Sequence, residues 1–208
     1  KLLLAGLLKP SYIPAKEQRE LRDLTRYRTK LIQSNASNKN RIIRILEDAN
    51  IKLSSVLSST NGAVGTKLID KICDGEEITM QDVDEVYHKK LAATKEEIFE
   101  ACEGFITEHH VYMLQIIRQE IAGTQQTIES LTQRIKEVLL PYENALELLK
   151  KVPGISSKSV EDLVAEIGLD MGVFPTEKHL ASWAGMSPGN NESAGKKKRT
   201  DNPGKQTS

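Results

Sequence analysis

Aromatic residues are scarce in this chain of 208 residues, in which one Trp, five Tyr and three Phe make up 4% of the sequence. Hydrophobic residues reach only 38%, whereas charged residues account for 28%. This composition is lean for a compact globule, and it is typical of long helices that each bury one apolar stripe. We therefore expect an all-α protein.

Cysteine is also rare, because the sequence contains only Cys73 and Cys102. A chain of this size needs no disulfide framework, so two reduced thiols in a cytoplasmic protein are expected. Cys102 with His109 and His110 matches no standard spacing of zinc ligands, and we predict no metal site in this chain.

Long hydrophobic runs are absent, which argues against a membrane protein. The opening run at residues 2–8 is far shorter than the roughly 20 residues of a transmembrane helix, and it lacks a signal-peptide cleavage pattern. We interpret residues 1–14 as the end of an upstream domain and a linker.

Net charge is absent too, but the formal balance of 29 basic and 29 acidic residues hides opposed blocks. Residues 16–44 are strongly basic, residues 70–103 are acidic, and a basic cluster returns at residues 196–199. Such segregation predicts a polyanion-binding surface together with a solvated or self-docking acidic region.

A long helix is predicted from residue 15 to about 59, with a break allowed. Its apolar residues recur at helical spacing, and its middle is interrupted by polar ones. The apolar positions are Leu21, Leu24, Leu31, Ile42, Ile45, Ala49 and Val56, and the polar ones are Arg28, Asn35 and Asn38. An acidic helical insertion follows at about 62–108, as two or three short helices, with Thr79 as a plausible N-cap.

The strongest periodicity lies in the next helix, where apolar positions alternate steps of three and four residues. They are Leu114, Ile117, Ile121, Thr124, Ile128, Leu131, Ile135 and Val138, and the register continues through Tyr142, Ala145 and Leu149. This heptad seam predicts a coiled coil within residues 15–149. The partner is either the first helix folded back antiparallel or a second copy of the chain; an ordinary amphipathic helix in a bundle is the alternative. Pro141 is expected to kink the helix.

A small helical module is predicted from residue 150 to the end of the chain. Residues 153–157 join two helices and resemble the turn of a helix-hairpin-helix element, in which backbone N–H groups hold a DNA phosphate. Gly154 and Ser156 are the candidate phosphate-contacting residues, although the element usually has a second glycine where this chain has Ser156. A plain helical corner is the alternative.

A serine beside a basic cluster is the candidate for chemistry. Ser193 is followed closely by four cations, Lys196, Lys197, Lys198 and Arg199. A serine hydroxyl that attacks a phosphodiester needs cations near it to hold the phosphate and its developing charge. Taken alone, such a stretch is usually a solvated basic loop.

The order of these motifs resembles a known family more specifically than any one of them. Residues 148–155, 165–168, Phe174, 180–189 and 192–196 occur in the order of its C-terminal signature, and residues 5–14 and 19–28 resemble the segment before its coiled coil. The family is that of bridge-RNA-guided insertion-sequence transposases, which includes the Piv-type DNA invertases.

The resemblance implies more than this chain contains. Family members carry an N-terminal RuvC-like domain with four acidic residues that bind divalent metal, a dimerising coiled coil, and a C-terminal domain whose serine acts in DNA strand exchange. Ser193 matches that serine. Because no RuvC-like domain is evident and residues 201–208 do not resemble the family's continuation, we expect a fragment that is inactive alone, with a truncated C-terminal domain at 150–208 and a disordered tail. Mg²⁺ is expected only in the missing domain.

The leading hypothesis is therefore that this chain is part of a DNA recombinase that forms homodimers or larger homo-oligomers. Its basic helix face, with Arg19, Arg22, Arg26 and Arg28, is expected to contact DNA or a guide RNA. The rival hypothesis is a non-catalytic coiled-coil scaffold that only binds and bridges duplexes, and the structural alternative for the arginines is a solvated helix face.

Overall fold

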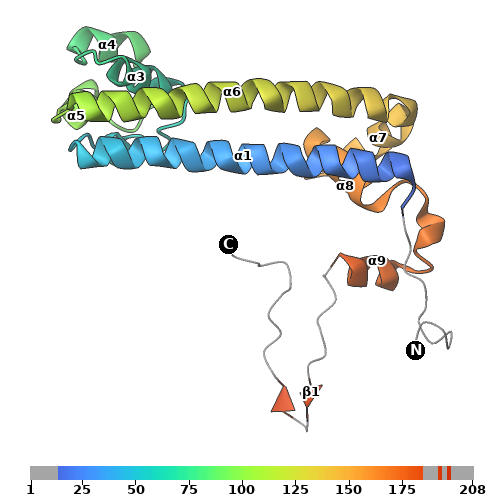
Figure 1. Ribbon diagram of the computed structural model, residues 1–208. Coiled ribbons are helices and arrows are strands. Elements are labelled where there is room, and N and C mark those ends of the chain that lie inside the picture. The colour runs from blue at the N-terminus through green and yellow to red at the C-terminus, as the bar shows by residue number, and fades with distance from the viewer. Residues whose placement is uncertain (1–13, 185–191, 194–195, 198–208) are drawn as a thin grey trace. The chain divides into compact units, whose positions relative to one another are not determined.

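The computed structural model describes residues 14–184, 192–193 and 196–197 (Figure 1). The described residues are all-α, as predicted, apart from one pair of two-residue strands. The elements are α1 (Lys16–Asp48), α2 (Leu53–Val56), α3 (Ala63–Cys73), α4 (Met80–Val86), α5 (Lys95–Cys102), α6 (Glu108–Leu139), η1 (Leu140–Tyr142), α7 (Glu143–Lys150), α8 (Ser157–Ile167), η2 (Met171–Val173), α9 (Glu177–Trp183), β1 (Glu192–Ser193) and β2 (Lys196–Lys197). None of the described helices is long and apolar enough to cross a membrane.

The chain divides into two compact units. One consists of Asp23–Pro141, and the other combines Lys1–Arg22 with Tyr142–Ser208. We describe each unit by itself.

The unit of Asp23–Pro141 is built on two long antiparallel helices, α1 and α6 (Figure 1). Near the end of α1, the Nε2 atom of His110 lies 3.4 Å from the carboxylate of Asp48, and at mid-helix the Nδ2 atom of Asn35 donates to the carbonyl oxygen of Ile121 at 3.4 Å. The two helices thus pair within one chain. This is the first of the two arrangements that the periodicity allowed.

The buried face of α1 is more polar than its leucines suggested. Leu24 and Leu31 are only half-buried. The positions that lie at helical spacing on the buried face are instead Leu21, Thr25, Arg28, Asn35, Asn38, Ile42 and Leu46. The residues that seemed to interrupt the stripe are therefore part of it, because the 3.6-residue period places them on the side that is covered.

The predicted seam of α6 is confirmed in its spacing. Leu114, Ile117, Ile128 and Ile135 are buried, and the remaining members between Ile121 and Val138 are half-buried. Its predicted continuation through Tyr142 is wrong, because that side chain is 47% exposed. The helix gives way to η1 around Pro141, which lacks a backbone donor and breaks the register.

The first long helix also ends earlier than predicted. The chain turns after α1, where Asn50 adopts a φ of 64°, and a separate short helix, α2, follows. Asparagine is one of the few residues with a side chain that tolerate this left-handed conformation. The break allowed within residues 15–59 therefore lies at 49–52.

The acidic insertion folds as three short helices, α3, α4 and α5, at one end of the α1–α6 pair (Figure 1). The predicted N-cap at Thr79 is confirmed, since its hydroxyl accepts from the backbone N–H of Asp82, whose carboxylate accepts from the N–H of Thr79 in return. Thr94 and Thr107 begin α5 and α6 with the same reciprocal arrangement. Apolar residues of all three insertion helices share one core with α1, α2 and α6.

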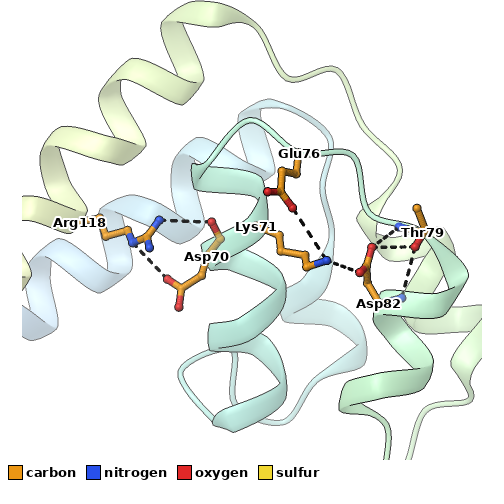
Figure 2. Close-up of polar contacts among 6 residues, drawn as sticks. All are labelled: Asp70, Lys71, Glu76, Thr79, Asp82 and Arg118. Atoms are coloured by element: carbon orange, nitrogen blue, oxygen red, sulfur yellow. Dashed lines mark hydrogen bonds and ion pairs between the residues drawn. The ribbon is translucent and has the colours of Figure 1, made fainter.

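Ion pairs hold many of the insertion's acidic residues. Lys71 bridges Glu76 and Asp82, as Figure 2 shows, and Arg118 on α6 reaches Asp70 and Asp74 with distances of 3.4 and 2.6 Å. The hydrogen bond from Lys71, with those from Thr79, lowers the pKa of Asp82 to about 2. This part of the acidic block is therefore internally neutralised.

Candidate nucleic-acid interface

The four arginines predicted to contact nucleic acid do not share one environment. Arg19 and Arg26 are exposed on α1. Arg28 is only 2% exposed, so it belongs to the covered face of α1 and is not part of the surface. Arg22 is half-buried and occupied by a different contact, described below. The prediction placed these four arginines on one face, which the helical period does not allow.

An exposed basic face of α1 lies opposite its covered side. With 3.6 residues per turn, Arg26, Lys30, Arg41 and Arg44 fall within about 60° of one another around the helix axis. We call these four residues the basic stripe. All four are exposed, and residues 24–46 contain no Asp or Glu. The stripe extends over about 27 Å, which matches the rise of about eight base pairs.

Sequence reasoning found Arg26 but missed the rest of the basic stripe. Lys30, Arg41 and Arg44 were visible as part of the basic block, and counting them around the helix would have identified them. Arg41 also donates from Nη1 to the Oδ1 atom of Asn38 at 3.3 Å. The guanidinium of Arg41 is therefore tied to the helix while its side chain remains exposed.

Arg22 caps the end of a helix within its own unit. Its Nη2 atom donates to the carbonyl oxygen of Glu166 at 2.6 Å, its Nε atom donates to that of Ala165 at 3.3 Å, and Nε lies 3.4 Å from the Glu166 carboxylate. Gln18 donates to the same two carbonyls. The last carbonyls of a helix have no partner within the helix, so a cation here stabilises the C-terminus of α8.

The turn before α8 has the geometry of a tight helical corner. Gly154 is exposed with a φ of +84°, a conformation that favours glycine, and a Cβ atom built there would meet nothing within 4 Å. Ser156 is the N-cap of α8, and its hydroxyl accepts from the N–H of Ser159 at 3.1 Å. One of the N–H groups that a phosphate could use is therefore already occupied. The helix-hairpin-helix assignment stays a prediction.

The backbone places Ser193 opposite a lysine of the basic cluster. β1 and β2 pair antiparallel, with Ser193 facing Lys196 and Glu192 facing Lys197 in the register. Lys198 and Arg199 lie outside the described residues, as do residues 185–191 and 201–208, which include most of the tail that we expected to be disordered. Ser193, the candidate nucleophile, and Lys196, the first cation of the cluster, are thus paired in the backbone of a two-residue strand pair.

A divalent metal has no evident site in this part of the molecule. Among the described residues, no group of three or more His, Cys, Asp or Glu side chains is arranged to hold a metal ion. The resemblance implies Mg²⁺ only for a RuvC-like domain, and we assign it no role in the described residues.

Comparison with protein families bears on the C-terminal part of the chain. Residues 146–206 match the Transposase IS116/IS110/IS902 family. The matched stretch begins within α7 and includes α8, α9, β1 and β2, whereas α1 to α6 lie outside it. The match supports a transposase role. Comparisons with curated proteins and with solved structures found no match.

Proposed function

We propose that this chain is the nucleic-acid-handling part of a DNA transposase, and that the basic stripe on α1 binds the phosphate backbone. The stripe carries the proposal, because four exposed cations on one helix face, with no acidic residue between residues 24 and 46, provide a surface of positive charge. The family match of residues 146–206 supports DNA as the ligand. A guide RNA has the same phosphate chemistry and is the second ligand to test.

Binding across a salt series tests the stripe. Replacing Arg26, Lys30, Arg41 and Arg44 with Gln should weaken binding to duplex DNA and reduce the salt slope, log K against log [salt], by up to about 3 to 4. The matched control removes the same charge elsewhere, at the exposed lysines Lys67, Lys89, Lys90 and Lys136. Equal slopes for the two variants would overturn the assignment of the stripe, and a structured RNA run in parallel shows which nucleic acid is preferred.

Ser193 is the proposed nucleophile in strand exchange. Its hydroxyl oxygen would form a phosphoester bond with a DNA phosphorus atom as its proton leaves, while the displaced DNA oxygen departs as a hydroxyl. Lys196, Lys197, Lys198 and Arg199 would hold the phosphate and stabilise its developing charge. The antiparallel pairing of Ser193 with Lys196 is the observation that supports this arrangement.

By the resemblance to the transposase family, the catalytic proposal also includes a metal-binding RuvC-like domain. In an enzyme that carries an acidic RuvC-like domain before this chain, we expect a covalent DNA adduct that mass spectrometry maps to Ser193. Ser193→Ala should abolish the adduct and leave DNA binding unchanged. Tight DNA binding with no adduct in either protein would favour the rival function, a non-catalytic scaffold that bridges duplexes.

Self-association through the long helices is the remaining part of the proposal. The α1–α6 pair leaves part of its apolar seam accessible to solvent. The half-buried residues of this seam are Leu24, Leu31, Ile121 and Leu131. A second copy packed along this pair would bury them, as coiled coils do.

We place this protein in the cytoplasm, where Cys73 and Cys102 would stay the free thiols that they are here.

A further inference from the structure

A strongly exposed aromatic side chain lies at the end of the unit of Asp23–Pro141 that carries the acidic insertion, next to the C-terminal end of α1. Phe105 is 83% exposed, and Tyr112 on α6 is 61% exposed. Both line an open groove of about 950 Å³ within the unit of Asp23–Pro141. Its lining includes apolar residues that we call the groove floor, namely Ile72, Ile78, Phe99, Ile106 and Val111.

The loop that presents Phe105 is held in place by its backbone. The N–H of Phe105 donates to the carbonyl oxygen of Ala49 at 2.7 Å, and the N–H of Lys52 donates to that of Ala101 at 2.8 Å. Gly104 packs so closely that an added Cβ atom would lie 2.4 Å from the Ala49 oxygen. The exposed ring therefore projects from a fixed backbone. Rigid aromatic side chains of this kind provide much of the binding energy at protein interfaces.

The rim of the groove is acidic. Glu76, Glu77, Glu103 and Glu108 line it, and the lining contains no Lys or Arg. Glu76 is in part neutralised by Lys71, at 3.9 Å, whereas Glu77, Glu103 and Glu108 are exposed. Such a rim repels nucleic acid, and it also disfavours the same groove of a second copy, because like charges would meet.

We propose that this groove is a docking site for a basic amphipathic helix of a partner protein. The apolar face of such a helix would lie on the groove floor against Phe105 and Tyr112, and its Lys or Arg side chains would meet the glutamates of the rim. Binding of an amphipathic helix in an apolar groove is a common mode of peptide recognition, and the charge pattern selects a basic partner.

The test uses the full chain and a synthetic probe, a fluorescent peptide of Leu and Lys about 18 residues long, which forms five turns of an amphipathic helix. Fluorescence anisotropy should show saturable binding of this peptide, and no binding of the same peptide with Glu in place of Lys. Phe105→Ala combined with Tyr112→Ala should weaken binding at least about tenfold. Glu77→Gln, Glu103→Gln and Glu108→Gln together should weaken it and flatten its salt dependence.

Matched controls separate the groove from general attraction to an acidic protein. Tyr27→Ala with Leu148→Ala removes two other exposed hydrophobic side chains, 52% and 66% exposed. A second control variant removes three exposed acids that do not line the groove, through Glu96→Gln, Glu100→Gln and Glu129→Gln. Both control variants should bind the peptide like the unmodified chain. Circular dichroism checks that every variant keeps its helices.

The proposal would be overturned if the Lys peptide showed no saturable binding, or if the groove and control variants lost equal peptide affinity. It would also be overturned if analytical ultracentrifugation found a homodimer that Phe105→Ala dissociates, because a second copy would then be the occupant. The glutamine variant gives an independent result if the aromatic variant folds poorly. None of these outcomes depends on the basic stripe, whose DNA binding is measured separately.

Discussion

Arg22 holds the carbonyl oxygen of Glu166 at 2.6 Å and lies 3.4 Å from the same residue's carboxylate, so two residues 144 positions apart close the C-terminus of α8. In the sequence, Arg22 is one basic residue among several on a helix. In the folded chain its guanidinium is occupied by a protein contact. A residue that charge alone assigns to nucleic acid is thus a structural cap.

Replacing Arg22 with Ala should destabilise the unit that contains α8. The loss should be about 1 to 2 kcal/mol in the free energy of unfolding, because two helix carbonyls and a carboxylate lose a cationic donor. Urea denaturation followed by circular dichroism measures it. Arg19→Ala is the control, since that side chain is exposed and should change stability little. A stable Arg22→Ala protein with much weaker DNA binding would instead make Arg22 a phosphate contact.

Thr79→Ala should lower the stability of the acidic insertion by about 1 kcal/mol, because the threonine side chain caps the first turn of α4. Thr94→Ala removes the equivalent cap of α5 and should have an effect of similar size. Thr127→Ala is the control, because Thr127 is exposed within α6 and alanine is the better helix former. A Thr79→Ala protein as stable as this control would show that the cap is dispensable.

The low pKa of Asp82 predicts an acid-dependent part of stability. Because the hydrogen bonds from Lys71 and Thr79 lower this pKa to about 2, against about 3.9 in an unfolded chain, the carboxylate stabilises the fold above pH 4. That contribution is lost as the pH falls from about 4 to 2. Asp82→Asn should therefore unfold at lower urea than the unmodified chain at pH 6, and the difference should shrink toward pH 2.

Lys71→Met tests the cause of the shift in Asp82. Without its largest cause, the pKa of Asp82 should rise toward its ordinary value, and the acid-dependent loss should begin at higher pH. A difference between the unmodified and Asp82→Asn proteins that stays constant from pH 6 to pH 2 would contradict the assignment.

Local features of the fold were predictable because their causes are local. The cap at Thr79 depends on a few neighbouring residues, and the spacing of α6 follows from the helical period. The partner of Asn35 was not predictable, because the hydrogen bond to the Ile121 carbonyl depends on which face of α1 meets α6. The strand pair at Ser193 also lay beyond sequence reasoning, since two residues give no periodicity.

The acid-rimmed groove escaped prediction for a different reason. The acidic block was visible in the sequence. It contains residues that are neutralised by an ion pair, such as Asp82, and residues that line the groove, such as Glu103, and only the fold distinguishes the two. Phe105 stood in an irregular stretch between helices, where the sequence does not distinguish an exposed ring from a buried one. Its backbone bond to Ala49 is a contact between segments 56 positions apart.

Both cysteines should be unreactive in the native protein. Burial raises the pKa of Cys73 to about 11 and that of Cys102 to about 12, so thiolate is scarce at pH 8. Alkylation by iodoacetamide at pH 8 should be at least about 100-fold slower than in denaturant, where the ordinary pKa of about 8.5 applies. Mass spectrometry resolves the two sites, and rapid labelling of either one in the native protein would contradict the prediction.

Two glycines of the same unit should respond in opposite directions to replacement by alanine. Gly104→Ala places a Cβ atom 2.4 Å from the carbonyl oxygen of Ala49 and 2.6 Å from Cγ1 of Ile51, so the loop must shift, at a cost of about 1 to 3 kcal/mol. Gly123→Ala meets nothing within 4 Å in the middle of α6 and should stabilise the helix by up to about 1 kcal/mol. Urea midpoints of the two variants measure the difference.

Because Gly104 positions Phe105, its variant should also bind the Leu/Lys peptide more weakly, whereas Gly123→Ala should bind it unchanged. Unaltered stability and peptide binding in Gly104→Ala would show that the loop is not fixed by this contact.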